Sequence, residues 1–376
     1  MDRRTFLGLS ASGLVGLGLT GPSTLLEGKT LPRGGGRYSV VVIGDTHYDV
    51  EPESVYHSCY NEPVEWLNRV QRGEFARNGE MWRDRCPRLI RRAACLADDS
   101  TRFALQVGDL VQGDCGNGDV HRKMLSDAMD TIKAELRGLP LVTVVGNHDI
   151  RGKDAKAVYH AYMPLRMSAE LGIPVKETTF SFPVGDDAWI VADFNHPDDA
   201  RMDALLAQTE GARHTFIVVH GPAFPFDEPS ARWFYQGSVK QTEARLHFRR
   251  EFARRNAIVL CGHTHRTELL DWYGDGGRIT QMTFNSVWAQ EGMGEYTVDS
   301  QGADQYGELR KKAMSNPDGT SLKDETALFD EYRPGIRRYI HSPSAGSYRL
   351  DVSRRGVTVD FYAGDSQARS ERFVLR

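Results

Sequence analysis

Residues 38–47 read YSVVVIGDTH, an apolar run that stops at a glycine and is followed by two residue types that bind metals. The run Tyr38–Ile43 is rich in β-branched residues and has the length of a buried β-strand. Gly44 permits a tight turn, and Asp45 and His47 come directly behind it. The segment therefore predicts a strand whose carboxyl end presents a carboxylate and an imidazole.

The same arrangement recurs farther along the chain. Short apolar runs predict strands that end at Val107, Val145, Val219 and Cys261. The polar residues that follow these runs are Asp109, then Asn147 with His148 and Asp149, then His220, and finally His263 with His265. In open α/β sheets ligands bind beyond the carboxyl ends of the strands, so we expect these side chains to converge.

A converged site of this composition needs cations. Two carboxylates about 4 Å apart repel each other by roughly 4 kcal/mol at an effective dielectric constant near 20. Imidazoles offset little of this repulsion near neutral pH, because most of them are unprotonated. The donors outnumber what one tetrahedral ion takes, which favours two cations that share one carboxylate. The candidate ligands are Asp45, His47, Asp109, Asn147, His220, His263 and His265.

The order D-x-H, G-D, G-N-H-D, H and G-H-x-H resembles the motif set of the calcineurin-like metallophosphoesterase family. The motifs lie between residues 38 and 265, and each follows an apolar run. Each motif alone is weak, whereas the complete ordered set is highly specific. The resemblance implies a metal-dependent phosphoric ester hydrolase. It also implies an α/β fold in which two mainly mixed β-sheets form a sandwich flanked by helices, in four layers α/β/β/α.

The resemblance further implies a role for each residue. Asp45, His47 and His265 would hold one metal ion, Asp109 would bridge, and Asn147, His220 and His263 would hold the second ion. His148 would face the substrate phosphate and the leaving oxygen, and Asp149 would orient His148 by accepting a hydrogen bond. The ligand set suits Mn, Fe or Zn. A hydroxide bridging the ions would attack phosphorus in line, and His148 would stabilise or protonate the leaving alkoxide.

The sequence differs from one subfamily at two positions of the motif set. Purple acid phosphatases have a glycine where His47 stands and a metal-binding tyrosine shortly after the second motif, where this chain reads Asp109-Leu-Val-Gln112. We therefore expect no tyrosinate–iron colour. His47 and the segment 262–265 are closer to the cyclic-nucleotide and general phosphodiesterase branches. The sequence leaves phosphodiester and phosphomonoester substrates both open.

The remaining pattern predicts one domain over residues 37–376. Strands are expected at 38–43, 103–107, 141–145, 215–219, 257–261 and 279–284, hairpins at 178–194 and 348–362, and helices at 87–97, 120–136, 199–208 and 242–255. Residues 49–84 and 285–346 lack a steady hydrophobic period and are expected to be long inserted loops.

The N-terminal segment 1–26 is expected to lie outside this domain. Residues 2–7 read DRRTFL, which resembles the twin-arginine export motif, and an uncharged, glycine-diluted stretch follows up to Leu26. The segment predicts export of the folded protein to the periplasm or the cell exterior. Cleavage is expected near residues 21–24, and retention would leave a membrane tether. No later apolar run approaches the ~20 residues of a membrane helix, so the mature chain is expected to lack a span.

Composition limits the function classes. The 376 residues are 40% hydrophobic and 26% charged, with a net charge of −4, as in an ordinary globular protein. The five cysteines form no Cys-x-x-Cys pair, which argues against a thiolate zinc site. Without a basic stripe, the chain is expected to act on a small-molecule phosphate ester and not on nucleic acid. Two alternatives stay open: a non-catalytic, metal-stabilised binding protein and a nuclease of the same family.

Some side chains outside the motifs allow both a structural and a functional interpretation. His57 is the histidine outside the motifs most expected to have a role, since it lies in the first long segment. The arginines between 83 and 92 are expected to form a solvated helix face rather than a phosphate-steering patch. Two aromatic sets could wall the site or simply pack: Phe224, Phe226, Trp233, Phe234 and Tyr235, and Tyr48, Tyr56, Tyr60 and Trp66.

Overall fold

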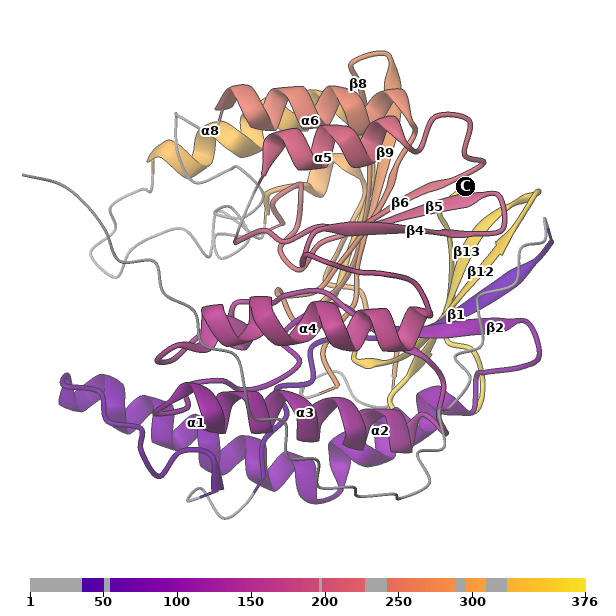
Figure 1. Ribbon diagram of the computed structural model, residues 1–376. Coiled ribbons are helices and arrows are strands. Elements are labelled where there is room, and N and C mark those ends of the chain that lie inside the picture. The colour runs from indigo at the N-terminus through magenta and orange to yellow at the C-terminus, as the bar shows by residue number, and fades with distance from the viewer. Residues whose placement is uncertain (1–35, 51–54, 196–197, 227–241, 288–294, 309–322) are drawn as a thin grey trace, which may run out of the picture.

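The strands form two sheets that enclose a shared apolar core. The computed structural model describes residues 36–50, 55–195, 198–226, 242–287, 295–308 and 323–376. Within these residues, the first sheet has six strands in the order β14-β13-β12-β1-β2-β3 and the second has eight in the order β10-β11-β8-β9-β7-β6-β5-β4. Both sheets mix parallel and antiparallel pairs, as expected (Figure 1).

In the first sheet a parallel centre carries an antiparallel flank. The parallel strands are β1 (Tyr38–Ile43), β2 (Thr101–Gln106) and β3 (Leu141–Thr143). The antiparallel strands are β12 (Gly346–Ser353), β13 (Gly356–Ala363) and β14 (Glu371–Val374). Every residue of β1 is buried, because the second sheet covers one face of this strand and helices cover the other.

The second sheet is also mixed. Its parallel run consists of β5 (Asp187–Val191), β6 (Thr215–Val218), β7 (Ile258–Cys261) and β9 (Gly277–Thr283). Its antiparallel strands are β4 (Phe180–Val184), β8 (Thr267–Gly274), β11 (Ile336–Ser342) and the short β10 (Ser300–Gln301). The chain thus sends the carboxyl ends of β1, β2 and β3 and those of β6 and β7 toward one region between the sheets.

Aromatic side chains join the two sheets. Trp189 of the second sheet packs edge-on against Phe103 of the first, with ring centroids 5.1 Å apart, and stacks on Phe216 at 4.1 Å. The Trp189 indole N–H donates to the Tyr38 hydroxyl at 3.1 Å. Since buried aromatic groups contribute large contact areas, these contacts hold the sheets face to face.

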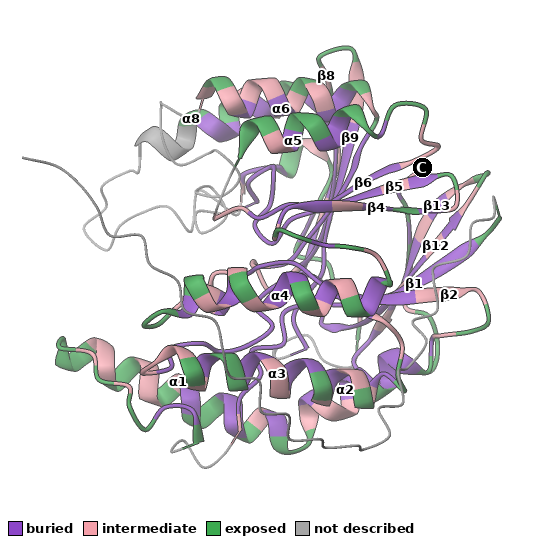
Figure 2. Cartoon of the chain, viewed as in Figure 1, coloured by how far each residue is buried: buried purple, intermediate pink, exposed green. Residues whose placement is uncertain are grey.

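Helices cover both outer faces of the sandwich (Figure 1). On the side of the first sheet lie α1 (Glu65–Arg83), α2 (Arg85–Ala94), α3 (Gly118–Glu135) and α4 (Ala155–Leu171). On the side of the second lie α5 (Asp199–Ala207), α6 (Thr242–Arg254) and α8 (Lys323–Tyr332). Figure 2 shows buried residues on the faces of these helices that turn toward the sheets. The four-layer α/β/β/α arrangement is therefore confirmed.

The predicted hairpins and the four predicted helices are present within a few residues of their expected bounds. The expectation of long inserted loops at 49–84 and 285–346 is wrong, because α1 occupies much of the first segment and β10, α8 and β11 lie in the second. The helix α4 was also missed, since Pro164 lies inside it and interrupts the helical pattern. Tertiary packing overrides these weak local signals.

Two expectations concern residues that the structure does not describe. The N-terminal segment 1–26 lies outside the described residues, as do Trp233, Phe234 and Tyr235. Among the described helices, none combines the length and apolarity of a membrane span.

Candidate metal centre

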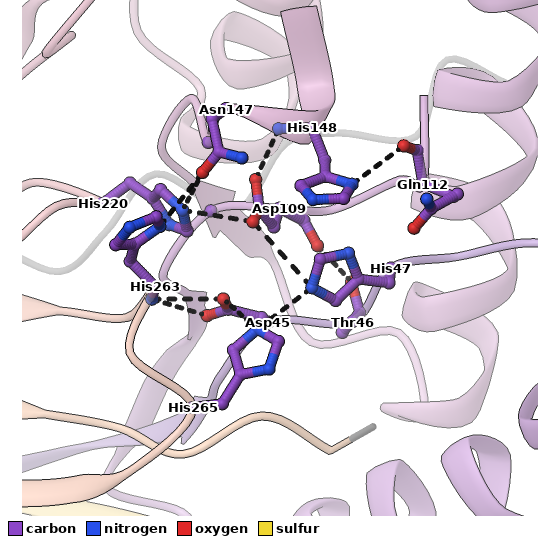
Figure 3. A network of polar contacts seen from close by, with 12 residues as sticks. Asp45, Thr46, His47, Asp109, Gln112, Asn147, His148, His220, His263 and His265 are labelled. Atoms are coloured by element: carbon purple, nitrogen blue, oxygen red, sulfur yellow. Dashed lines mark hydrogen bonds and ion pairs between the residues drawn. The ribbon is translucent and has the colours of Figure 1, made fainter. Parts of the chain in front are cut away.

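The structure brings together the polar residues that follow the buried strands. Asp45 and His47 come behind β1, Asp109 behind β2, His220 behind β6, and His263 and His265 behind β7. Asn147 follows β3 by a few residues. Figure 3 shows these side chains pointing toward one another at the carboxyl ends of the strands. The geometric expectation of convergence is met across a chain separation of more than two hundred residues, although ligation itself stays a prediction.

The first group of potential ligands consists of Asp45, His47 and His265. The Asp45 Oδ2 atom lies 3.0 Å from His265 Nε2, and the Nε2 atoms of His47 and His265 lie 3.1 Å apart. One ligand atom from each residue lies within 4.8 Å of the others. A carboxylate oxygen and two imidazole nitrogens at this spacing suit a transition-metal cation.

The second group consists of Asp109, His220 and His263, with Asn147 beside them. The Asp109 Oδ2 atom lies 3.2 Å from His220 Nε2. The Asn147 side-chain oxygen lies 3.2 Å from His220 Nε2 and 3.0 Å from His263 Nδ1. These oxygen and nitrogen atoms lie close enough together to bind a second cation.

Asp109 belongs to the second group and also lies near the first. Its Oδ2 atom is 3.2 Å from His220 Nε2 in one group and 3.8 Å from His47 Nε2 in the other. Its Oδ1 atom accepts a hydrogen bond of 2.7 Å from the backbone N–H of His148. A single carboxylate therefore faces both groups, which is the geometry that a bridging ligand needs.

The backbone around the site allows unusually close approaches. His47, Asp109, His263 and His265 all have positive φ values, of 41°, 51°, 72° and 52°. Such strained conformations gather at functional sites, where the surrounding structure holds them. A Cβ on Gly108 would lie 2.4 Å from the His220 ring, so only glycine lets this imidazole reach its position.

Hydrogen bonds outside the ligand groups orient the donors. The His220 Nδ1–H donates to the Val107 carbonyl at 2.9 Å, which leaves Nε2 facing Asp109 and Asn147. The Asp45 carboxylate accepts from the backbone N–H of His263 at 3.1–3.2 Å. Such second contacts fix the tautomer and the direction of a metal-binding histidine.

Burial and neighbouring charges shift the titration of these groups. Burial lowers the pKa of His263 to about 3. Burial alone would raise the pKa of Asp109, but His220 holds it well below its usual range, and Asp109 in turn raises the pKa of His220 to about 9 against the effect of burial. An ionised carboxylate beside a neutral imidazole can bind a cation directly, and binding at His220 would release a proton. The donor chemistry thus fits a pair of cations.

His148 lies beside the two groups, but Asp149 does not orient it. The His148 Nδ1–H donates to the Gln112 carbonyl at 3.0 Å, while the Asp149 carboxylate accepts from the backbone N–H groups of Val111 at 3.0 Å and Gly146 at 2.8 Å. The predicted hydrogen bond between His148 and Asp149 is therefore wrong. Asp149 instead joins the loops that carry Asp109 and Asn147, because each loop has a buried backbone N–H, that of Val111 or of Gly146, that needs an acceptor.

Most of the other candidates outside the motifs pack into the domain. His57 is fully buried, lies 2.9 Å from the Asp49 carboxylate through Nε2, and stacks on Phe75 with centroids 3.6 Å apart. Tyr48 and Tyr56 are buried, as are Phe224 and Phe226, whereas Trp66 is 60% exposed. Arg88 and Arg91 pair with Asp365 and Glu135 on the surface of the domain, whereas Arg92 is buried and donates to the Ser366 carbonyl at 2.8 Å. The expectation of a solvated face is therefore wrong for Arg92.

Two residues near the site escaped the sequence reasoning. Gln112 holds His148 through its backbone carbonyl, and Arg151 Nη1 lies 3.3 Å from His148 Nε2. A contact with a backbone carbonyl cannot be predicted from residue types, because every residue has this group. Arg151 follows the third motif closely, but its partners on α1 belong to a segment that was expected to be a loop.

The chain is similar to one protein family and to several solved structures. The model of the family described as calcineurin-like phosphoesterase matches residues 38–267. A solved structure of PhoD is 12% identical and has a TM-score of 0.52, over 92% of this chain and 70% of that one. A dimetal phosphatase from Danio rerio is 13% identical with a TM-score of 0.46, over 90% of this chain and 98% of that one.

At 12% identity, the likeness to PhoD is one of fold alone. A comparison with curated proteins found no match. The family model, by contrast, spans more than half of the chain and covers every motif around the metal centre. The chain therefore belongs to the calcineurin-like phosphoesterase family and is a metal-dependent phosphoric ester hydrolase.

Proposed function

We propose that this protein is an exported dinuclear phosphoesterase that hydrolyses a small phosphodiester or phosphomonoester. One observation carries the proposal: the Asp109 carboxylate faces both ligand groups, at 3.2 Å from His220 and 3.8 Å from His47. Two cations held there by the seven predicted ligands would supply a nucleophile from water at neutral pH and neutralise charge on the phosphoryl oxygens. Mn, Fe and Zn all suit the donors.

His148 completes the proposed site. Its Nδ1–H is engaged by the Gln112 carbonyl, so Nε2 is the nitrogen that would act on a substrate oxygen, and it donates to that oxygen only when the imidazole is protonated. A positioned imidazole contributes ~10²–10⁴-fold to rate by proton transfer or hydrogen bonding. The place of its ring supports a role toward the leaving oxygen, since the ring centroid lies 4.4 Å from that of His47 and one of its nitrogens lies within 4.8 Å of donor atoms of His47 and Asp109.

The test is hydrolysis of bis-p-nitrophenyl phosphate and p-nitrophenyl phosphate after loading with Mn. The wild type is expected to turn over at least one substrate, and Asp109→Ala is expected to bind fewer than two metals and to lose turnover. Asp203→Ala is the control, since Asp203 pairs with His247 on the surface far from the site. Absence of turnover above Asp109→Ala on a broad panel of phosphate esters would refute the proposal.

The same assays separate the alternatives. Two bound metals, measured by mass spectrometry, without turnover of any ester would favour a non-catalytic binding protein. Cleavage of single- or double-stranded DNA in preference to the small esters would favour a nuclease.

The proposed export rests on residues 1–26. The pair Arg3-Arg4 and the uncharged stretch behind it support the twin-arginine route, which carries folded proteins. A fusion of residues 1–36 to a reporter should leave the cytoplasm, and replacing both arginines by lysine should retain it. Export that is indifferent to this replacement would contradict the proposed route.

A further inference from the structure

Arg151 is held beside His148 by contacts along one edge of its guanidinium group. Nε lies 2.6 Å from the Asp114 carboxylate, and Nη2 donates to the Gln71 side chain at 3.0 Å and lies 3.4 Å from the Glu74 carboxylate. The backbone is fixed as well, because the Arg151 carbonyl accepts from the Asp114 N–H at 2.7 Å. These contacts fix the Nε–Nη2 edge of the guanidinium group, and Nη1 is not part of them.

The other terminal nitrogen, Nη1, lies beside His148. It lies 3.3 Å from His148 Nε2, the atom placed toward the substrate. Since His148 Nδ1 donates to Gln112, Nε2 can accept one N–H of Nη1, and the second N–H stays available for a ligand. The Arg151 side chain is 30% exposed, so a ligand can reach it.

The partners of Arg151 on α1 form one face of that helix. Gln71, Glu74 and Asn78 are spaced three and four residues apart, which places them on the same side. The Gln112 side chain donates to Glu74 at 3.1 Å and accepts from Asn78 at 2.5 Å. We call Gln71, Glu74 and Asn78 the α1 polar face. It contacts both residues that hold His148, namely Gln112 and Arg151.

We propose that Arg151 is a substrate-binding residue that donates from Nη1 to a phosphoryl oxygen, and that the α1 polar face positions it. Guanidinium groups are well suited to this role, since they present rigid, permanently charged donors to phosphate. The inference rests on the proposed phosphoesterase function and adds a specificity element to it. We expect the N–H of Nη1 to favour a phosphomonoester, whose phosphoryl group carries more charged oxygens, over a phosphodiester.

The direct test replaces Arg151 in the metal-loaded protein. Arg151→Ala is expected to raise KM for p-nitrophenyl phosphate about 10- to 100-fold, the usual effect of losing a hydrogen bond to a charged group. The rise for bis-p-nitrophenyl phosphate should be smaller. Affinity for inorganic phosphate, measured by calorimetry, should fall in parallel. Arg151→Lys should recover part of the affinity, because lysine keeps the positive charge but lacks the rigid planar set of N–H donors of a guanidinium group.

The α1 polar face is tested by a double-mutant cycle. Glu74→Gln should raise KM less than Arg151→Ala does, and the double variant should be no worse than Arg151→Ala alone, because both act through one guanidinium. A KM increase in Glu74→Gln that simply adds to that of Arg151→Ala would refute the positioning role. The control is Arg166→Ala, since Arg166 pairs with Asp130 and is 23% exposed, and its KM should be unchanged.

The outcomes distinguish this inference from the proposed function. If the wild type hydrolyses either ester but Arg151→Ala keeps its KM and its affinity for phosphate, only the role of Arg151 is refuted. An equal loss of kcat on both esters with unchanged KM also refutes it, since Arg151 would then act only through His148. If the wild type hydrolyses neither ester, the proposed function fails first, and calorimetry with inorganic phosphate still tests whether Arg151 binds phosphate.

Discussion

Substitution of Gly262 tests whether the close approach of the loops builds the metal centre. A Cβ on Gly262 would lie 2.3 Å from Asp45 Oδ1, whereas ordinary contacts begin near 3.4 Å. Asp45 must therefore retreat by about 1 Å in Gly262→Ala, and a displacement of that size costs roughly 10²-fold in rate. Because Asp45 belongs to the group with His47 and His265, we expect one of the two metals to bind more weakly.

The assay combines kcat/KM on a p-nitrophenyl ester with metal content per chain. Gly262→Ala should lose about 10²-fold in kcat/KM and should hold fewer metals at limiting metal concentration. The extra methyl group also crowds Val107, so a loss of about 1–3 kcal/mol in the free energy of unfolding is expected. Circular dichroism checks that the variant remains folded.

Gly73 supplies the matched control. It lies within α1, and no atom stands within 4 Å of an added Cβ. Gly73→Ala should keep full activity and gain about 0.5–1 kcal/mol of stability, because alanine loses less backbone entropy in a helix. Wild-type metal content and rate in Gly262→Ala would refute the argument, since Asp45 would then have tolerated a contact that requires it to move.

Three further changes test other parts of the molecule. His148→Ala should lose ~10²–10⁴-fold in kcat and keep two metals, because the backbone N–H of residue 148 still holds Asp109; loss of a metal would contradict this. Chelation with EDTA should abolish turnover and lower the melting temperature, and Mn, Fe or Zn should restore both; turnover that survives chelation would exclude the metal-dependent mechanism. Trp189→Ala should cost about 3–5 kcal/mol in urea denaturation at unchanged metal content, because its ring fills the core between the sheets; a much smaller cost would show that the sheets do not depend on this contact.

Much of the candidate site was accessible from the sequence because its residues follow strands. An apolar β-branched run such as Tyr38–Ile43 reports burial, and the residue behind it must leave the sheet at its carboxyl end. The topology then brings such ends together, so Asp45 and Asp109 could be expected in one place. The helices within 49–84 and at 155–171 were harder to predict from the sequence, because polar residues in the first and an internal proline in the second obscure their apolar stripes.

The interactions around His148 could not be predicted in the same way. Its partner is a backbone carbonyl, that of Gln112, and every residue has such a group. The family resemblance implied Asp149 as the partner of His148, but the Asp149 carboxylate accepts from two backbone N–H groups instead. Which acceptor a side chain reaches depends on loop conformation, including the positive φ values at His47 and Asp109.

The amino-acid order alone determined the family, the strands that carry the site and the set of candidate ligands, because hydrophobic period and motif order are properties of the chain itself. The folded molecule decided what surrounds those ligands. It placed the Asp109 carboxylate near both groups, gave His148 a carbonyl partner and brought the α1 polar face to Arg151. Such contacts join residues that are distant in sequence at distances of about 3 Å, and only the packing of the layers defines positions that finely.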